Sequence, residues 1–178
     1  MLRIAIALLS LAASVIGSCP DTLPGLLEVP DSIDVTINYA LVPSNPPAAN
    51  NGLFCARLEV EGNSWVGFGI SVSGQMIGSE AIIALPDDGT VFKYDLNGKG
   101  TNLVVKMEDD MQTLMNTSIA QGGGKTVIEF TKMLIEDGEI PILESGLNYF
   151  LLARGSSSEF GYHGSNRVAF TKDFSEDI

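Results

Sequence analysis

Short stretches in which apolar and polar residues alternate recur along most of this chain. Between residues 33 and 41, for example, Ile33, Val35 and Ile37 alternate with polar residues. A period of two residues is typical of a β-strand with one buried face. The same reasoning predicts strands at residues 33–41, 54–60, 65–71, 81–85, 90–96, 102–107, 112–120, 125–131, 147–153 and 168–170, and one helical turn at 131–137. Many short strands separated by turn residues predict an all-β sandwich or barrel rather than alternating α/β units.

The first 18 residues have the pattern of a secretory signal peptide. A basic start at Arg3 is followed by an apolar run from residue 4 to 16 and by the small residues Gly17 and Ser18. Such a run is too short for a membrane-spanning helix. We therefore expect cleavage near residue 18 and a secreted product in which residues 19–178 form a single domain without a membrane span.

Two cysteines, Cys19 and Cys55, remain after such cleavage. In an exported protein a pair of cysteines usually forms a disulfide, which here would close a loop of about 36 residues. Cys55 shares one face of the 54–60 strand with Arg57 and Glu59, so it points away from the core and lies within reach of the N-terminal segment. A lipid-attachment site at Cys19, as in bacterial lipoproteins, is the alternative.

Charge and histidine content exclude several classes of function. The formal net charge of −12 argues against nucleic acid and against an anionic membrane surface as partners. His163 is the only histidine, so zinc sites with two or three histidines are impossible. No serine lies in a Gly-x-Ser-x-Gly turn, which argues against a serine hydrolase.

Met76 and His163 are the remaining candidates for cofactor chemistry. Each lies in a glycine-rich loop beside aromatic residues, whereas core methionines and histidines usually lie on a strand face. A thioether and an imidazole together form a known axial pair for haem iron. Their spacing alone also allows a chance occurrence of one methionine and one histidine in loops.

Three segments of the sequence resemble the DOMON family. Residues 65–71 (WVGFGIS) and 74–81 (GQMIGSEA) are similar to its central signature, and residues 162–167 (YHGSNR) are similar to its late His-x-x-x-Arg loop. The likeness extends over roughly residues 30–172, and in kind the chain is similar to the cytochrome domain of cellobiose dehydrogenase and to secreted DOMON cytochromes. It implies an immunoglobulin-like antiparallel β-sandwich that binds haem b through Met76 and His163.

The function implied by this resemblance is that of a b-type cytochrome that transfers single electrons. The expected partner is an extracellular redox protein or a small-molecule reductant, and an electron carrier is favoured over a catalyst. The alternatives are a haem-free module of the same fold that binds carbohydrate or another small ligand, and a haem scavenger.

Asn116-Thr117-Ser118 is a candidate N-glycosylation sequon. Glycosylation requires Asn116 to face solvent. The alternation of residues 114–119 does not decide whether Asn116 lies on the solvent-facing side of the strand.

Overall fold

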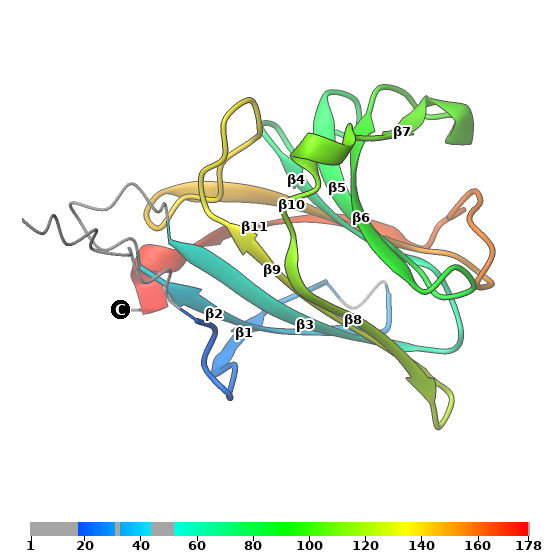
Figure 1. The fold of residues 1–178 in the computed structure, drawn as a ribbon, viewed down its shortest axis with the longest axis horizontal. Coiled ribbons are helices and arrows are strands. Elements are labelled where there is room, and N and C mark those ends of the chain that lie inside the picture. Colours follow the sequence, from blue (N-terminus) through cyan, green and yellow to red (C-terminus); the bar gives the residue numbers. More distant parts are fainter. Residues whose placement is uncertain (1–17, 31–32, 44–51, 178) are drawn as a thin grey trace, which may run out of the picture.

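Two antiparallel sheets face each other in this protein (Figure 1). The computed structural model describes residues 18–30, 33–43 and 52–177. The five-stranded sheet has the order β1 (Gly25–Leu27), β2 (Val35–Val42), β3 (Leu53–Glu61), β9 (Lys125–Met133), β8 (Met115–Gly122). The six-stranded sheet has the order β11 (Arg167–Asp173), β10 (Leu147–Arg154), β4 (Val66–Ser71), β5 (Ser79–Leu85), β6 (Thr90–Leu96), β7 (Val104–Lys106). Short 3-10 helices are η1 (Thr101–Leu103), η2 (Asp109–Met111) and η3 (Phe174–Asp177).

The core lies between the inner faces of the two sheets. Alternate residues of each strand point inward, as Val66, Phe68 and Ile70 do on β4. Five phenylalanine rings fill the centre with centroid separations of 5.1–6.3 Å: Phe54, Phe68, Phe130, Phe150 and Phe174. Burial of an aromatic side chain of this kind stabilises the fold by about 1.5–3 kcal/mol. The all-β sandwich predicted from the sequence is thus confirmed.

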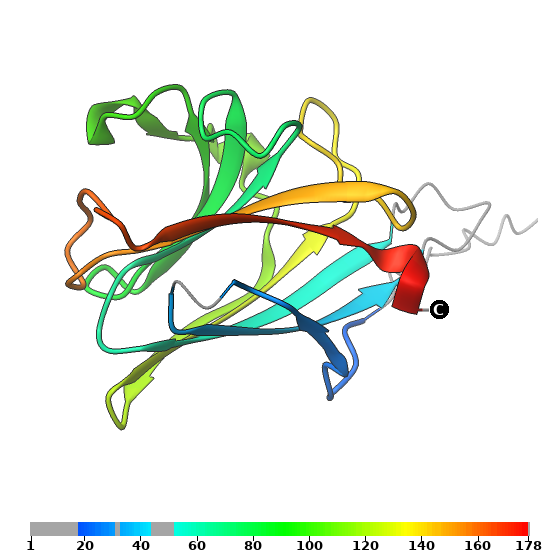
Figure 2. The same cartoon turned by 180° about the vertical axis from the view of Figure 1, so that it is seen from behind.

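The register of β4 and β10 determines where their following loops emerge. The two strands are antiparallel, with Ser71 opposite Tyr149 and Val66 opposite Arg154. The loop after Ser71 therefore leaves one end of this strand pair, and the loop after Arg154 leaves the other. Figure 2 shows the loop between β10 and β11, in orange, at the same side of the molecule as η1 and β7, in green.

A disulfide joins Cys19 to Cys55, as the sequence predicts. Cys55 lies on the outer face of the five-stranded sheet but is only 2% exposed, because the N-terminal segment covers it. Cys19 and Leu23 belong to the same apolar cluster as Leu53. The Sγ atom of Cys19 is bonded to that of Cys55, which is inconsistent with the lipid attachment considered as an alternative.

Most predicted strands agree with the structure within a few residues. The helical turn expected at 131–137 is wrong, because residues 131–133 continue β9 by pairing with β3 and a turn-rich loop follows. The short strand β1 was not predicted, and the segment 112–120 becomes a strand only from Met115. Of the proposed signal peptide, residues 1–17 lie outside the described residues. In the described part of the chain, no helix is long and apolar enough to cross a membrane.

Replacing both cysteines by serine should destabilise the sandwich without altering the outer face of the six-stranded sheet. The bridge spans 36 residues, and loss of such a constraint lowers the free energy of unfolding by about 2–4 kcal/mol. Urea unfolding of Cys19→Ser/Cys55→Ser against the oxidised parent would measure the loss. Reductant should lower the stability of the parent alone. Two thiols that react with a labelling reagent in the native protein would contradict the bridge.

Candidate functional site

A cavity of about 460 Å³ lies on the outer face of the six-stranded sheet. This volume falls within the range of about 300–1,000 Å³ that is usual for small-molecule and cofactor sites. Trp65 and Ile83 contribute large apolar side chains to it. Small residues from four adjacent strands also line the cavity: Gly67, Gly69, Ala81, Ala153 and Ala169.

Two glycines of β4 leave the part of the outer sheet face beneath the cavity without side chains. Gly67 and Gly69 alternate with the inward-facing Val66, Phe68 and Ile70, so any side chain on them would point outward. A Cβ atom on Gly69 would lie 2.9 Å from Cβ of Leu151, closer than carbon atoms pack. One on Gly67 would lie 3.6 Å from both Trp65 and Ile83. Glycine thus leaves room on this strand for a ligand to approach the backbone.

Met76 reaches the cavity from the loop between β4 and β5. Two buried serines hold this loop, because the hydroxyl groups of Ser71 and Ser79 both donate to the carbonyl oxygen of Gln75, at 3.1 and 2.5 Å. The backbone amide of Gly78 donates to the carbonyl of Leu96, which attaches the loop to the end of β6. The position of Met76 is therefore fixed by hydrogen bonds on both sides of it. Neither serine was predicted from the sequence as a site residue.

His163 reaches the same cavity from the loop between β10 and β11. Its Nδ1 atom is 3.0 Å from the carbonyl oxygen of Gly164. A carbonyl only accepts, so Nδ1 carries the hydrogen and the lone pair of the neutral ring is on Nε2. Nε2 is then the nitrogen that can bind a metal, with the ring oriented by its second nitrogen.

The loop that carries His163 is anchored to the floor through Trp65. Phe160 meets the Trp65 ring edge-on at 5.1 Å, and backbone hydrogen bonds join Trp65 to Gly155 and Ser157. A Cβ atom on Gly155 would lie 2.3 Å from Nε1 of Trp65, so this approach requires glycine. The sequence identified Trp65 as part of a motif but did not predict which residues it contacts.

The structure brings Met76 and His163 together at one cavity from loops that leave opposite ends of β4 and β10. A group bound between them would be approached by sulfur from one side and by imidazole nitrogen from the other. In the described part of the chain, no cluster of three or more His, Cys, Asp or Glu side chains could hold a bare metal ion. Haem iron takes its equatorial ligands from the porphyrin, so one thioether and one imidazole complete its coordination. The sulfur of Met76, the imidazole of His163 and the space left by the glycines of β4 therefore fit haem.

A family model of the DOMON domain matches residues 49–155. The chain belongs to the DOMON domain family. The match covers more than half of the 178 residues and confirms the resemblance of residues 65–71 and 74–81 to this family. It includes the glycine-bearing strand β4 and Met76 but ends before His163, so the histidine loop of this DOMON protein lies beyond the matched part.

The other predicted residues lie away from the cavity. The disulfide is on the outer face of the opposite sheet. Asn116 is exposed, with φ of 50°, where an irregularity interrupts the pairing of β8 with β9. The sequon is thus accessible, and glycosylation of Asn116 stays a prediction that the mass of native protein before and after glycosidase treatment would test.

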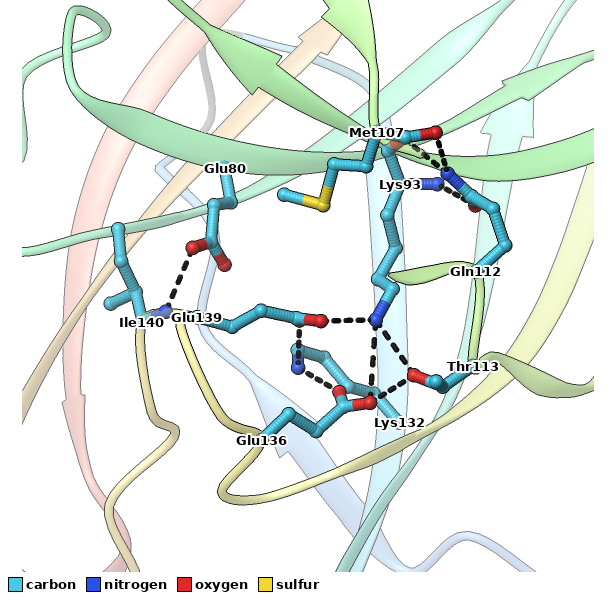
Figure 3. A network of polar contacts seen from close by, with 9 residues as sticks. All are labelled: Glu80, Lys93, Met107, Gln112, Thr113, Lys132, Glu136, Glu139 and Ile140. Atoms are coloured by element: carbon cyan, nitrogen blue, oxygen red, sulfur yellow. Dashed lines mark hydrogen bonds and ion pairs between the residues drawn. The ribbon is translucent and has the colours of Figure 1, made fainter. Parts of the chain in front are cut away.

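A buried network of four charges, which the sequence pattern did not predict, lies in the interior of the DOMON sandwich (Figure 3). Lys93 on β6 and Lys132 on β9 bind Glu136 and Glu139 of the following loop. Nζ of Lys93 is 3.3 Å from Glu136 and 2.5 Å from Glu139, and Nζ of Lys132 is 2.8 Å from Glu139. None of the four side chains is more than 5% exposed. Burial would raise the pKa of Glu136, but hydrogen bonds from Lys132 and Thr113 and the charges of both lysines hold that pKa below its usual value.

Glu80 lies beside this network and has an unusual carboxyl group. One oxygen accepts from the backbone amide of Ile140 at 2.8 Å, and the other is buried without a hydrogen-bond partner. Burial raises the pKa of Glu80 to about 7, and the negative charges of Glu139 and Asp95 act in the same direction. The amide of Ile140 and the charge of Lys132 oppose this shift. Glu80 therefore titrates near neutral pH.

Glu80→Gln should remove a pH-dependent component of stability. A carboxyl group whose pKa rises from 4.5 to about 7 on folding holds its proton more tightly in the folded state. Its contribution to stability is complete below about pH 4.5 and is lost as the pH rises to about 7. The urea midpoint of Glu80→Gln relative to that of the parent should therefore increase as the pH rises from 4.5 to about 7. Glu108→Gln, at an exposed position, is the control and should show no such increase. Parallel curves for the parent and Glu80→Gln would contradict the assignment.

Proposed function

We propose that this protein is a b-type cytochrome that binds one haem in the cavity and transfers single electrons. The observation that carries the proposal is that Met76 and His163 line one cavity from opposite ends of β4 and β10. Each side chain lies on a loop fixed by hydrogen bonds, and Nε2 of His163 is free to act as a ligand. Haem held by these two side chains would supply a one-electron couple of iron.

The residues of this chain would perform three tasks for such a cofactor. Met76 and His163 would hold the iron, and a thioether ligand would raise the reduction potential relative to a second imidazole. Trp65, Ile83 and Leu151 exclude water from the floor. Tyr162, which is 69% exposed, lies at the mouth, where an extracellular redox protein or a small reductant can approach.

The carbohydrate-binding alternative has less support. A sugar needs hydrogen-bonding groups across the surface that it covers, whereas glycine, alanine, leucine and isoleucine form the floor of this cavity. Export from the cytoplasm is part of the proposal. The disulfide supports it, because such bonds persist in oxidising compartments, and so does the pattern of residues 1–18.

An absorption spectrum of the purified protein, after addition of one equivalent of haem, tests the proposal directly. A six-coordinate His/Met haem should give a Soret band, and sharp α and β bands on reduction. Absence of saturable haem binding would overturn the proposal and leave the haem-free module as the better hypothesis.

Met76→Ala should convert the six-coordinate iron to a five-coordinate or ligand-exchangeable form and lower its reduction potential. Among the described residues, Met76 is the only methionine that lines the cavity, so no other thioether can replace it. Met115→Leu is a matched control, because Met115 packs against the disulfide cluster on the other sheet. An unchanged low-spin spectrum in Met76→Ala would show that Met76 is not the ligand.

His163→Ala should lose most of the bound haem, since the chain has no second histidine. Added imidazole should restore a low-spin spectrum if the variant remains folded. Tyr162→Phe, at the neighbouring exposed position, should retain haem and serves as the control. A normal six-coordinate spectrum in His163→Ala without imidazole would refute the assignment.

A further inference from the structure

The cavity differs in charge from the rest of the molecule. The chain has 22 acidic and 10 basic residues, yet within the described part no aspartate or glutamate lines the cavity. Two basic side chains, Lys99 and Arg167, do line it. A cavity with cations and no acids is unexpected by chance in a protein of net charge −12.

Lys99 and Arg167 also lack the acidic partners that most other basic residues have. Ion pairs are formed, among others in the described part of the chain, by Arg57, Lys93, Lys106, Lys125, Lys132 and Arg154. Lys99 makes no ion pair with any described residue, and Arg167 donates only to neutral oxygens. Those oxygens are the carbonyl of Gly164 at 2.9 Å and the hydroxyl of Tyr162 at 3.5 Å.

Each of the two cations is held close to one of the ligand-bearing loops. Lys99 lies in the loop between β6 and β7, where Leu103 packs so tightly on Gly98 that a Cβ atom there would be 2.4 Å away. The end of β6 also accepts the amide of Gly78 from the Met76 loop. Arg167 begins β11, directly after the His163 loop, and its guanidinium binds that loop. Both side chains are exposed, so they suit anionic groups at the mouth rather than at the floor.

We infer that Lys99 and Arg167 form an anion-binding subsite at the mouth of the cavity, so the ligand combines an apolar body with carboxylate groups. The apolar body lies on the floor, and the carboxylates point to solvent between the two cations. A carboxylate accepts charge-assisted hydrogen bonds from lysine and arginine, which are stronger than those between neutral groups. This inference deepens the proposed function, because the two propionates of haem b are groups of this kind. Neutral sugars lack them.

Metal-free protoporphyrin IX and its dimethyl ester separate this subsite from iron ligation. Neither porphyrin contains iron, so Met76 and His163 cannot coordinate it, and the two differ only in their carboxylates. Binding can be followed through quenching of Trp65, the only tryptophan, which lies on the floor of the cavity. The parent should bind the diacid about tenfold more tightly than the ester at low salt, and the preference should shrink at high salt.

The variants should change this preference in a defined pattern. Lys99→Gln should weaken binding of the diacid roughly threefold and leave binding of the ester unchanged. Arg167→Lys keeps the charge and should keep most of the preference, whereas Lys99→Gln combined with Arg167→Gln should abolish it. Lys125→Gln removes the same charge at the hairpin between β8 and β9 and should bind both porphyrins like the parent.

The results distinguish failure of the subsite from failure of the proposed function. Equal binding of diacid and ester by the parent, or equal losses for both in Lys99→Gln, would overturn the subsite even if haem gives a His/Met spectrum. A diacid preference that depends on Lys99, without a six-coordinate haem spectrum, would support the subsite and refute the iron ligation. No quenching of Trp65 by either porphyrin would overturn the subsite.

Discussion

The alternation of residues on β4 is the constraint on which both the core and the cavity depend. Val66, Phe68 and Ile70 fill the space between the sheets, whereas Gly67 and Gly69 add no side chain to the outer face. Because successive side chains point to opposite faces, one strand can build a dense core and a hollow at the same time. A shift of one residue in its pairing with β10 or β5 would bury the glycines and expose the phenylalanine. The correct register of β4 is therefore required for stability and for the site.

Charge is distributed in this protein so that the interior and the cavity differ in chemistry. In the interior, Lys93 and Lys132 neutralise Glu136 and Glu139, and removal of one partner from such a pair leaves an uncompensated buried charge that costs about 3–5 kcal/mol. At the cavity, Lys99 and Arg167 are exposed and form no ion pair with an acidic residue in the described part of the chain. The first arrangement satisfies its charges internally and holds a loop. The second leaves positive charge for a ligand to neutralise.

The sequence predicted those features that depend on residues close together in the chain. Alternation located most strands, and glycine-rich loops singled out Met76 and His163, which the fold places at one cavity. It did not predict the charged network, because Lys93 and Lys132 meet only after β6 and β9 are placed in different sheets. A signal was present, since each lysine occupies an inward position of its strand, and lysine is seldom buried without a carboxylate partner. The network also ties Glu136 and Glu139, in the loop after β9, to lysines of two strands.

Membership of the DOMON family does not by itself decide what the cavity binds. The matched residues contain the floor and Met76, whereas His163 and Arg167 follow the end of the match at residue 155. His163 and Arg167 therefore come from one loop and from the strand that follows it, both outside the matched residues. Arg167 binds the carbonyl of Gly164, and that carbonyl accepts from Nδ1 of His163. The guanidinium therefore binds the same carbonyl that orients the imidazole, so the positions of Arg167 and His163 depend on each other.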